Sequence, residues 1–563
     1  MKQQSSGKGF AVLSTASVVC KILSLIYLPL QTWVVGDSGN GIIGIGMRLY
    51  TFIYALTNAG LPLVISKFVS EQLAVGDYRS AHKTFRSAFI VMMSIGVLST
   101  VLMFSCADWI AVAYCHTPQA ALMLRTISPT FLFTAVSCSL RGYSQGRHDM
   151  TPTAISQVIE QAFNTVFTVS FIVLFSEYAR HLHADGQSYA AAGSAVGTVM
   201  GAVSSAVVLG FLFLVVHRRE YEEEIRHQTY DGPVIATSTI YRQIIRYSIP
   251  AIISTIASSG IDLIDTNSVV WMLGAGGYSQ TAATALFGIY TYKYQRVMTL
   301  ATMFVAPMVT AMIPALSSAL ARDDHKYFRY KILESYKLIF ITIMPIVAGL
   351  MFLAKPILTV IFIHHNAGSS LVLAGTWIAV LVAIQTIQSG ILMSMGHTLV
   401  SPVTTIIGIA AKVLCNYLLI RVPSVNIYGA VLGNALVWVI AIVLNAVYIH
   451  RAVGHRLPYM RYLIVPGAVS LVMGVVARGV YEVFDRGIGL VLHRGAVAVN
   501  DFSTVVAVAV GALVYVTMMI KTGAVRASDI DKMPMGGKLR RYLSRLRFLH
   551  KELAVPADKS PEA

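Results

Sequence analysis

Four basic residues lie inside long apolar stretches of this sequence: Lys21, Arg48, Lys293 and Arg296. A charge at the centre of a membrane-spanning helix costs about 2.5–3.5 kcal/mol, so four charges facing lipid would cost roughly 10–14 kcal/mol. That cost is comparable to the whole stability of a typical domain. We therefore expect these side chains to be hydrated or paired. Because arginine and lysine bind phosphate strongly, a water-filled cavity lined by all four would suit an anionic substrate.

Lys293 and Arg296 are three residues apart, which predicts that they share one face of a helix. They lie in the polar segment YTYKYQR, so we expect this face to line water. Asp262 and Asp265 of the preceding apolar stretch have the same spacing. They offer an alternative, in which the four cations pair with them or extend toward the membrane surface. A third interpretation is that the two aspartates bind a coupling cation.

A polar stripe runs along another apolar stretch, with Thr153, Gln157, Glu160 and Asn164 at spacings of four, three and four residues. We expect Glu160 and Asn164 to line the cavity or to make polar contacts between helices. Arg125 and Lys412 are single intramembrane cations. Each is explained equally well by a local pair or by an extended side chain, so neither belongs to the predicted site.

No motif of a soluble enzyme fits its surroundings. The segment GYSQG at 142–146 matches a nucleophile elbow but follows an apolar helix rather than a strand. A Walker A sequence and an HExxH motif are both absent, and the five cysteines lack the spacing of a metal site. We predict a transporter without catalytic residues, metal ligands or a bound cofactor.

The composition is that of an integral membrane protein. Of the 563 residues 56% are hydrophobic and only 12% are charged, with a mean hydropathy of +0.67, whereas soluble domains are about 25% charged. The net charge of +17 comes from basic residues between the apolar stretches, so it predicts no nucleic-acid partner. About fourteen stretches could span a membrane, which predicts an all-α polytopic fold. The first two, Gly9–Val35 and Gly41–Ser70, are joined by a short GDSGN turn.

The distribution of Lys and Arg predicts the orientation. If the N-terminus is cytoplasmic, the inner connections hold nineteen of these residues and the outer connections six. This bias favours an even number of spans with both termini in the cytoplasm. The basic tail, RRYLSRLRFLHK, either rests on anionic lipid or is simply solvated.

The sequence repeats itself at a shift of about 247 residues. This shift places Gly41 on Gly288, Ser70 on Ser317 and Asp77 on Asp324. Six spans separate the copies, so we predict two parallel six-helix lobes with substrate binding between them. The predicted parts are an N-lobe at 1–217, a linker at 218–245, a C-lobe at 246–450, two further helices at 451–520 and a basic tail at 521–563.

Several segments resemble bacterial polysaccharide-export flippases, in particular the branch of stage V sporulation protein B and YtgP, which is related to the MurJ lipid II flippases. They include VCKILSLIYLPLQ, NAGLPLVISKFVSEQLAVGDYRSA, LRGYSQGRHDMTPTAISQVIEQ and VNIYGAVLGNAL. The resemblance covers residues 9–520. It implies two six-helix lobes in a V, as in the multidrug/oligosaccharidyl-lipid/polysaccharide superfamily, plus two C-terminal helices that form a groove for a lipid tail.

The resemblance also implies a function at the bacterial plasma membrane. Basic residues on the first, second and eighth helices of such flippases meet a lipid-linked pyrophosphate. The matching positions are Lys21, Arg48 and Arg296, with Lys293 beside the last, although some relatives carry paired arginines on the first helix. We expect a flippase that moves an undecaprenyl-pyrophosphate-linked saccharide outward by alternating access. Lipid II is the favoured substrate, and a sporulation polymer is left open.

The expected partners are this lipid-linked saccharide, membrane lipids and cell-wall synthesis proteins. Direction would require an ion, the membrane potential or removal of the product outside. Two alternatives stay open. One is a cation-coupled multidrug exporter of the same superfamily, and the other is a membrane glycosyltransferase or polymerase that uses the same lipid carrier.

Overall fold

The computed structural model describes residues 6–58, 61–217, 230, 232–362, 366–454, 458–491 and 496–524. These residues form helices and connections, and no strand occurs among them. The predicted all-α fold is confirmed. Nearly half of the predicted linker, residues 218–229 and 231, and nearly all of the predicted basic tail lie outside the described residues.

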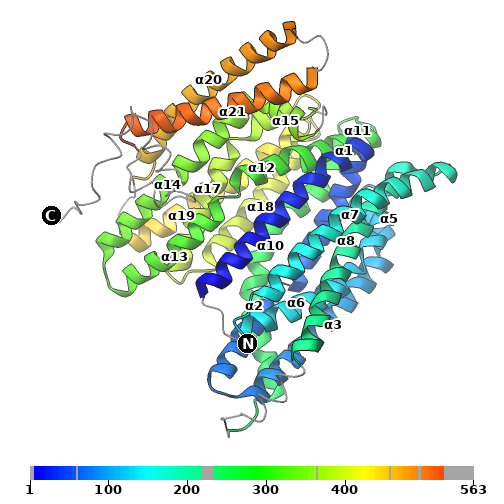
Figure 1. The fold of residues 1–563 in the computed structure, drawn as a ribbon, viewed down its shortest axis with the longest axis vertical. Helices are drawn as coiled ribbons and strands as arrows, with labels where there is room; N and C mark the ends of the chain where they lie inside the picture. Colours follow the sequence, from blue (N-terminus) through cyan, green and yellow to red (C-terminus); the bar gives the residue numbers. More distant parts are fainter. Residues whose placement is uncertain are drawn as a thin grey trace. The chain divides into compact units, whose positions relative to one another are not determined.

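The helices are shown in Figure 1. The helices of the first part of the chain are α1 (Ser6–Asn58), α2 (Leu61–Ala74), α3 (Tyr78–Ser105), α4 (Ala107–Trp109), η1 (Ile110–Tyr114), α5 (Ala120–Ile127), α6 (Thr130–Gly146), α7 (Thr151–His181), α8 (Gly186–Leu212) and η2 (Phe213–His217). Those of the second part are α10 (Thr237–Ala275), α11 (Gln280–Gly288), η3 (Ile289–Tyr294), α12 (Gln295–Thr302), α13 (Val305–Ala321), α14 (His325–Phe352), α15 (Ala354–Ile361), α16 (Ser369–Gly375), α17 (Ile378–Ser394), α18 (Val400–Leu419), α19 (Tyr428–Val453), α20 (Arg461–Val491) and α21 (Ala496–Lys521).

The predicted membrane spans coincide with long helices. Eleven helical segments of the described chain are long and apolar enough to cross a membrane, and α16 with α17, bent by 45°, makes twelve. The first two predicted spans lie in α1 and α2, which are outside this count. The protein is therefore a multi-pass membrane protein, and the total of fourteen spans stays a prediction.

The GDSGN segment bends α1. Gly36, its first residue, has φ 72° and ψ −179°, and the chain is helical on both sides of it. Only glycine adopts this backbone region readily, because any Cβ would clash with the main chain. The predicted turn between the first two spans is thus a kink at a single glycine, and the helix resumes before Gly41.

The internal repeat has the same local structure in both copies. Asp77 caps the N-terminus of α3 by accepting a hydrogen bond from the Ser80 amide, with φ −90° and ψ 74°. Asp324, its counterpart, caps α14 through the Tyr327 amide, with φ −87° and ψ 77°. An aspartate at this position satisfies one amide that the first helical turn leaves without a partner.

The repeat also generates a reciprocal contact between α1 and α11. A Cβ on Gly41 would collide with the backbone of Thr284, and one on Gly288 would collide with the backbone of Asp37. The same shift of 247 residues relates Gly41 to Gly288 and Asp37 to Thr284. Each copy therefore contributes the same two positions to the contact, which is the signature of two-fold symmetry.

The chain divides into two compact units. The first comprises residues 1–292 and 405–434, and the second comprises residues 293–404 and 435–563. The core of the first unit gathers around α2, α3 and α6, with Ile65, Phe85 and Tyr143 buried in it. This division differs from the predicted lobes, whose boundaries near 217 and 246 stay a prediction.

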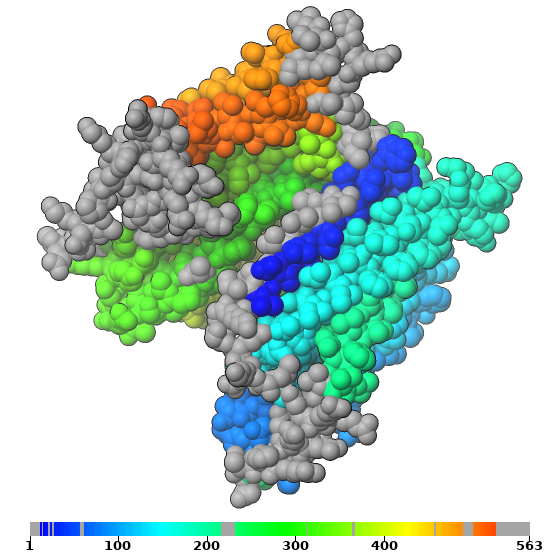
Figure 2. All heavy atoms as spheres, viewed as in Figure 1, coloured from blue at the N-terminus to red at the C-terminus, as the bar shows by residue number. Residues whose placement is uncertain are grey.

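In the second unit, α13, α14 and α17 enclose a core that includes Phe328 and Ile387. The C-terminal helices α20 and α21 lie side by side and pack on α14 through Ile341, Met473 and Met519. Figure 2 shows the described parts of these two helices as one continuous orange surface.

Candidate functional site

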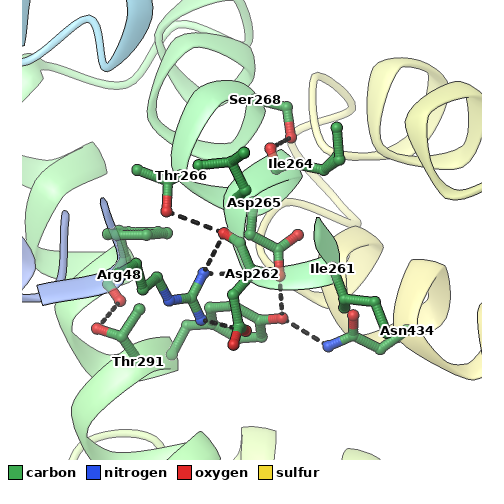
Figure 3. Close-up of polar contacts among 12 residues, drawn as sticks. Arg48, Ile261, Asp262, Ile264, Asp265, Thr266, Ser268, Thr291 and Asn434 are labelled. Atoms are coloured by element: carbon green, nitrogen blue, oxygen red, sulfur yellow. Dashed lines mark hydrogen bonds and ion pairs between the residues drawn. The ribbon is translucent and has the colours of Figure 1, made fainter. Parts of the chain in front are cut away.

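Two aspartates on α10 organise the polar site of the first unit (Figure 3). α10 ends at Ala275, where Gly276 and a left-handed Gly277 follow. Asp262 and Asp265 lie about one turn apart on this helix. Their side chains differ in exposure, since that of Asp265 is fully buried and that of Asp262 is 47% exposed.

Asp265 is held by polar groups from other helices. The Tyr290 hydroxyl of η3 donates to Oδ2 at 2.6 Å. On α18, Lys412 Nζ lies 2.8 Å from Oδ1, and Asn416 Nδ2 donates to the same oxygen at 3.1 Å. A buried carboxylate needs this kind of compensation, because burial removes its hydration. Asp265 thus joins α10, η3 and α18.

Lys412 is fully buried and surrounded by oxygen atoms. Besides contacting Asp265, its ammonium donates to the Ile261 carbonyl at 3.2 Å and to the side-chain oxygen of Asn434 on α19. The Asn434 amide in turn donates to the Tyr290 hydroxyl at 2.7 Å. The resulting network links α10, η3, α18 and α19.

Gly433 allows α19 to approach this network closely. A Cβ at this position would lie 2.6 Å from Asn416 Oδ1 and 3.1 Å from the Lys412 stem. Any larger residue would therefore displace the side chains that hold Asp265.

Arg48 brings α1 to the same site. Its Nη1 donates to the Asp262 carbonyl at 3.2 Å and lies 3.8 Å from Asp265 Oδ2, while its Nη2 lies 3.4 Å from Asp262 Oδ1. The guanidinium also lies over the rings of Phe287, at 5.1 Å, and Tyr290, at 5.5 Å. Its side chain is only 9% exposed.

We call these seven residues the charge cluster: Arg48, Asp262, Asp265, Tyr290, Lys412, Asn416 and Asn434. It contains two basic and two acidic groups, so their formal charges cancel. An arrangement of this kind holds helices together inside a membrane.

Of the predicted site residues, the structure brings Arg48, Asp262 and Asp265 together. Internal pairing with the aspartates, one of the alternatives from the sequence, is the arrangement seen for Arg48. Lys412 was missing from the predicted site although it lies at the centre of the cluster. The signal that could have found it is its spacing of four from Asn416, which places two polar side chains on one face of an apolar helix.

The remaining predicted cations have different surroundings. Lys293 lies in the π-helical turn η3 and is fully buried, whereas Arg296 lies in α12 and is exposed. Both belong to the second unit. Lys21 is a residue of α1, but its side chain lies outside the described part of the structure.

Glu160 and Asn164 make polar contacts within the first unit. Glu160 forms an ion pair of 2.6 Å with Arg141 of α6, which also donates to Ser205 of α8 at 2.8 Å. Asn164 accepts a hydrogen bond from Thr168 at 2.9 Å.

Arg125, the other isolated cation, pairs locally with Asp108. Within the described ranges no group of three or more His, Cys, Asp or Glu side chains could hold a metal ion.

Comparison with known proteins identifies the family. The family model described as polysaccharide biosynthesis protein matches residues 6–320, which is more than half of the chain. Three Bacillus subtilis proteins are similar over nearly their whole length. The uncharacterized membrane protein YabM is 25% identical, with 96% of both chains covered. The lipid II flippase MurJ is 23% identical, covering 90% of this chain and 94% of MurJ. Stage V sporulation protein B is 22% identical, covering 96% and 99%.

Solved structures show the same fold. An inward-facing multidrug resistance transporter of the MATE family matches with a TM-score of 0.62 and 18% identity, covering 77% of this chain and 95% of its own. A MOP superfamily transporter from Pyrococcus furiosus matches with a TM-score of 0.55 and 17% identity, covering 80% and 97%. The chain therefore belongs to the polysaccharide biosynthesis protein family, and its fold is that of the MATE and MOP superfamily transporters.

Proposed function

We propose that this protein is a flippase that moves an undecaprenyl-pyrophosphate-linked saccharide from the inner to the outer leaflet, with lipid II as the favoured substrate. The observation that carries the proposal is similarity along nearly the whole chain to a protein named lipid II flippase, which covers 90% of this sequence. The buried Arg48 supplies suitable chemistry, because a guanidinium binds phosphate oxygens in bidentate geometry.

In this proposal Lys21, Arg48, Lys293 and Arg296 meet the pyrophosphate during transport. Their charge offsets the cost of taking a phosphate away from the aqueous surface. The lipid tail stays in the membrane, where α20 and α21 present apolar side chains such as Ile464, Val475 and Val505 to their surroundings.

The proposed orientation places both termini in the cytoplasm, as the excess of inner Lys and Arg predicts. The proposed lobes comprise residues 1–217 and 246–450, connected by 218–245 and followed by 451–520 and the basic tail 521–563. Membrane lipids surround the protein, and cell-wall synthesis proteins are its proposed partners. A coupling ion or the membrane potential would give transport its direction.

A second candidate function is a cation-coupled multidrug exporter. Two observations favour it, namely the fold shared with a MATE transporter and the intramembrane carboxylates Asp262 and Asp265. Intramembrane acids are typical of proton and ion pathways. The charge cluster fits this function less well, because Arg48 and Lys412 neutralise both acids.

Complementation of a bacterium depleted of its lipid II flippase tests the proposal. We expect the wild type to restore growth and the Arg48→Ala variant to fail at equal membrane abundance. Lys67→Ala is a matched control, because Lys67 is also a cation on a described helix but is 44% exposed and pairs with Glu71. Failure of a well-expressed wild type would exclude lipid II as substrate, and full rescue by Arg48→Ala would exclude Arg48 from the site.

Drug accumulation distinguishes the second function. Cells that express an exporter retain less of a fluorescent cationic drug, whereas we expect this protein to leave drug retention unchanged.

A further inference from the structure

We infer that the Asp262 carboxylate is a stand-in anion, which occupies Arg48 until the pyrophosphate of the substrate replaces it. This inference deepens the proposed function and rests on its claim that the substrate carries phosphate. It is carried by the different ways in which the two aspartates of the charge cluster are held (Figure 3).

The two carboxylates differ in their exposure to water. Asp265 is fully buried, and the tyrosine, lysine and asparagine contacts described above all lie within 3.1 Å. The Asp262 side chain is 47% exposed, and its Oδ1 lies 3.4 Å from Arg48 Nη2. A charge-assisted hydrogen bond normally measures about 2.7–2.9 Å. The Asp262 carboxylate is therefore reached by water beside Arg48, whereas the Asp265 carboxylate is enclosed.

Arg48 keeps other contacts when the Asp262 carboxylate moves away. Its Nη1 donates to the main-chain carbonyl of residue 262, which does not depend on that side chain. The rings of Phe287 and Tyr290 lie against the guanidinium. The side of the guanidinium that bears Nη2 then faces the position vacated by a carboxylate. A phosphate oxygen has the charge and hydrogen-bonding capacity to replace a carboxylate oxygen there.

This exchange would link binding to movement. The Asp262 carboxylate joins α10 to α1, so a phosphate that displaces it removes one contact between these helices. A ligand shifts a conformational equilibrium only through a difference in its affinity for the two states. Here the difference arises because the phosphate and Asp262 compete for the same guanidinium. Binding of the substrate to Arg48 thus changes the contact between α1 and α10.

The test is binding of undecaprenyl pyrophosphate to the purified full-length chain in nanodiscs. We expect Asp262→Asn to bind about tenfold more tightly than the wild type, which corresponds to about 1.4 kcal/mol. Asp262→Glu keeps the charge and should bind within about twofold of the wild type. Asp108→Asn is a matched control, because it removes a carboxylate that pairs with a different arginine, Arg125. It should leave affinity unchanged.

The Arg48→Gln background separates competition from a general change in charge. If Asp262 acts by occupying Arg48, the tenfold gain disappears when Arg48 is absent. A gain of equal size in the Arg48→Gln background would overturn the inference, as would wild-type affinity in Asp262→Asn. If the wild type does not bind the pyrophosphate lipid at all, the proposed substrate class fails and the inference falls with it. Binding that depends on Arg48 but not on Asp262 leaves the proposed function standing and refutes the inference alone.

Discussion

Replacing Lys412 by Met should destabilise the protein strongly, although Lys412 was not predicted to be functional. Methionine retains most of the volume and removes the charge. The Asp265 carboxylate would then stay buried without the ammonium that lies 2.8 Å from it. Removing one partner of a buried ion pair typically costs about 3–5 kcal/mol, because the other charge remains without compensation.

The geometry suggests the lower end of this range. At an effective dielectric constant of about 20, a pair at 2.8 Å attracts with about 6 kcal/mol, and the Arg48–Asp265 pair at 3.8 Å with about 4 kcal/mol. Arg48 therefore retains part of the compensation, and the Tyr290 and Asn416 hydrogen bonds to Asp265 persist. We expect a loss of about 3 kcal/mol in the free energy of unfolding.

Thermal unfolding in detergent, followed by size-exclusion chromatography, measures the effect. A loss of 1 kcal/mol lowers the midpoint by about 2–4 °C in domains of moderate size, so we expect a decrease of about 6 °C or more. The Lys412→Met/Asp265→Asn double variant removes both charges and should recover about half of the loss. A Lys412→Met protein as stable as the wild type would refute the reasoning, and so would a double variant whose loss is the sum of the two single losses.

Three further predictions concern backbone contacts and thiol exposure. Gly288→Ala should lower the thermal midpoint by several degrees, because its Cβ would collide with the Asp37 backbone, whereas Gly210→Ala, with open space around it, should not. Gly36→Ala should cost about 1–3 kcal/mol in the same assay, since alanine strains at φ 72°; an unchanged midpoint would contradict the kink. An impermeant maleimide should label the exposed Cys106 on intact cells but not Cys115, because burial raises the pKa of the Cys115 thiol to about 12. Labelling of Cys106 only after lysis would reverse the proposed orientation.

Hydropathy predicted the helices well because each one has to be apolar along its own length. The predicted span Gly9–Val35, for instance, lies entirely in the part of α1 that precedes the kink at Gly36. The repeat was also predictable, since Asp77 and Asp324 are capping residues whose role is local. Local sequence therefore accounts for most of the secondary structure.

The charge cluster was predictable only in part, because its contacts join distant segments. Asn416 and Asp265 are 151 residues apart in the chain, and Arg48 and Asp262 are 214 apart. Sequence showed that these charges need partners but not which partner each would take. The direction of the Lys293 side chain was equally hard to predict from the sequence. Lys293 lies in a π-helical turn, whose periodicity differs from that of an α-helix.

The contact of Gly41 and Gly288 has a consequence for the origin of the chain. Two copies joined only by gene fusion have no reason to meet through equivalent residues. In the first copy Gly41 packs against the backbone of Thr284. In the second copy the equivalent Gly288 packs against the backbone of Asp37, the equivalent of Thr284. A self-complementary interface of this kind is how identical subunits form a two-fold dimer. We therefore expect the ancestor to have been a protein of half this length that paired with itself, and the crossing of α1 and α11 preserves that pairing inside a single gene product.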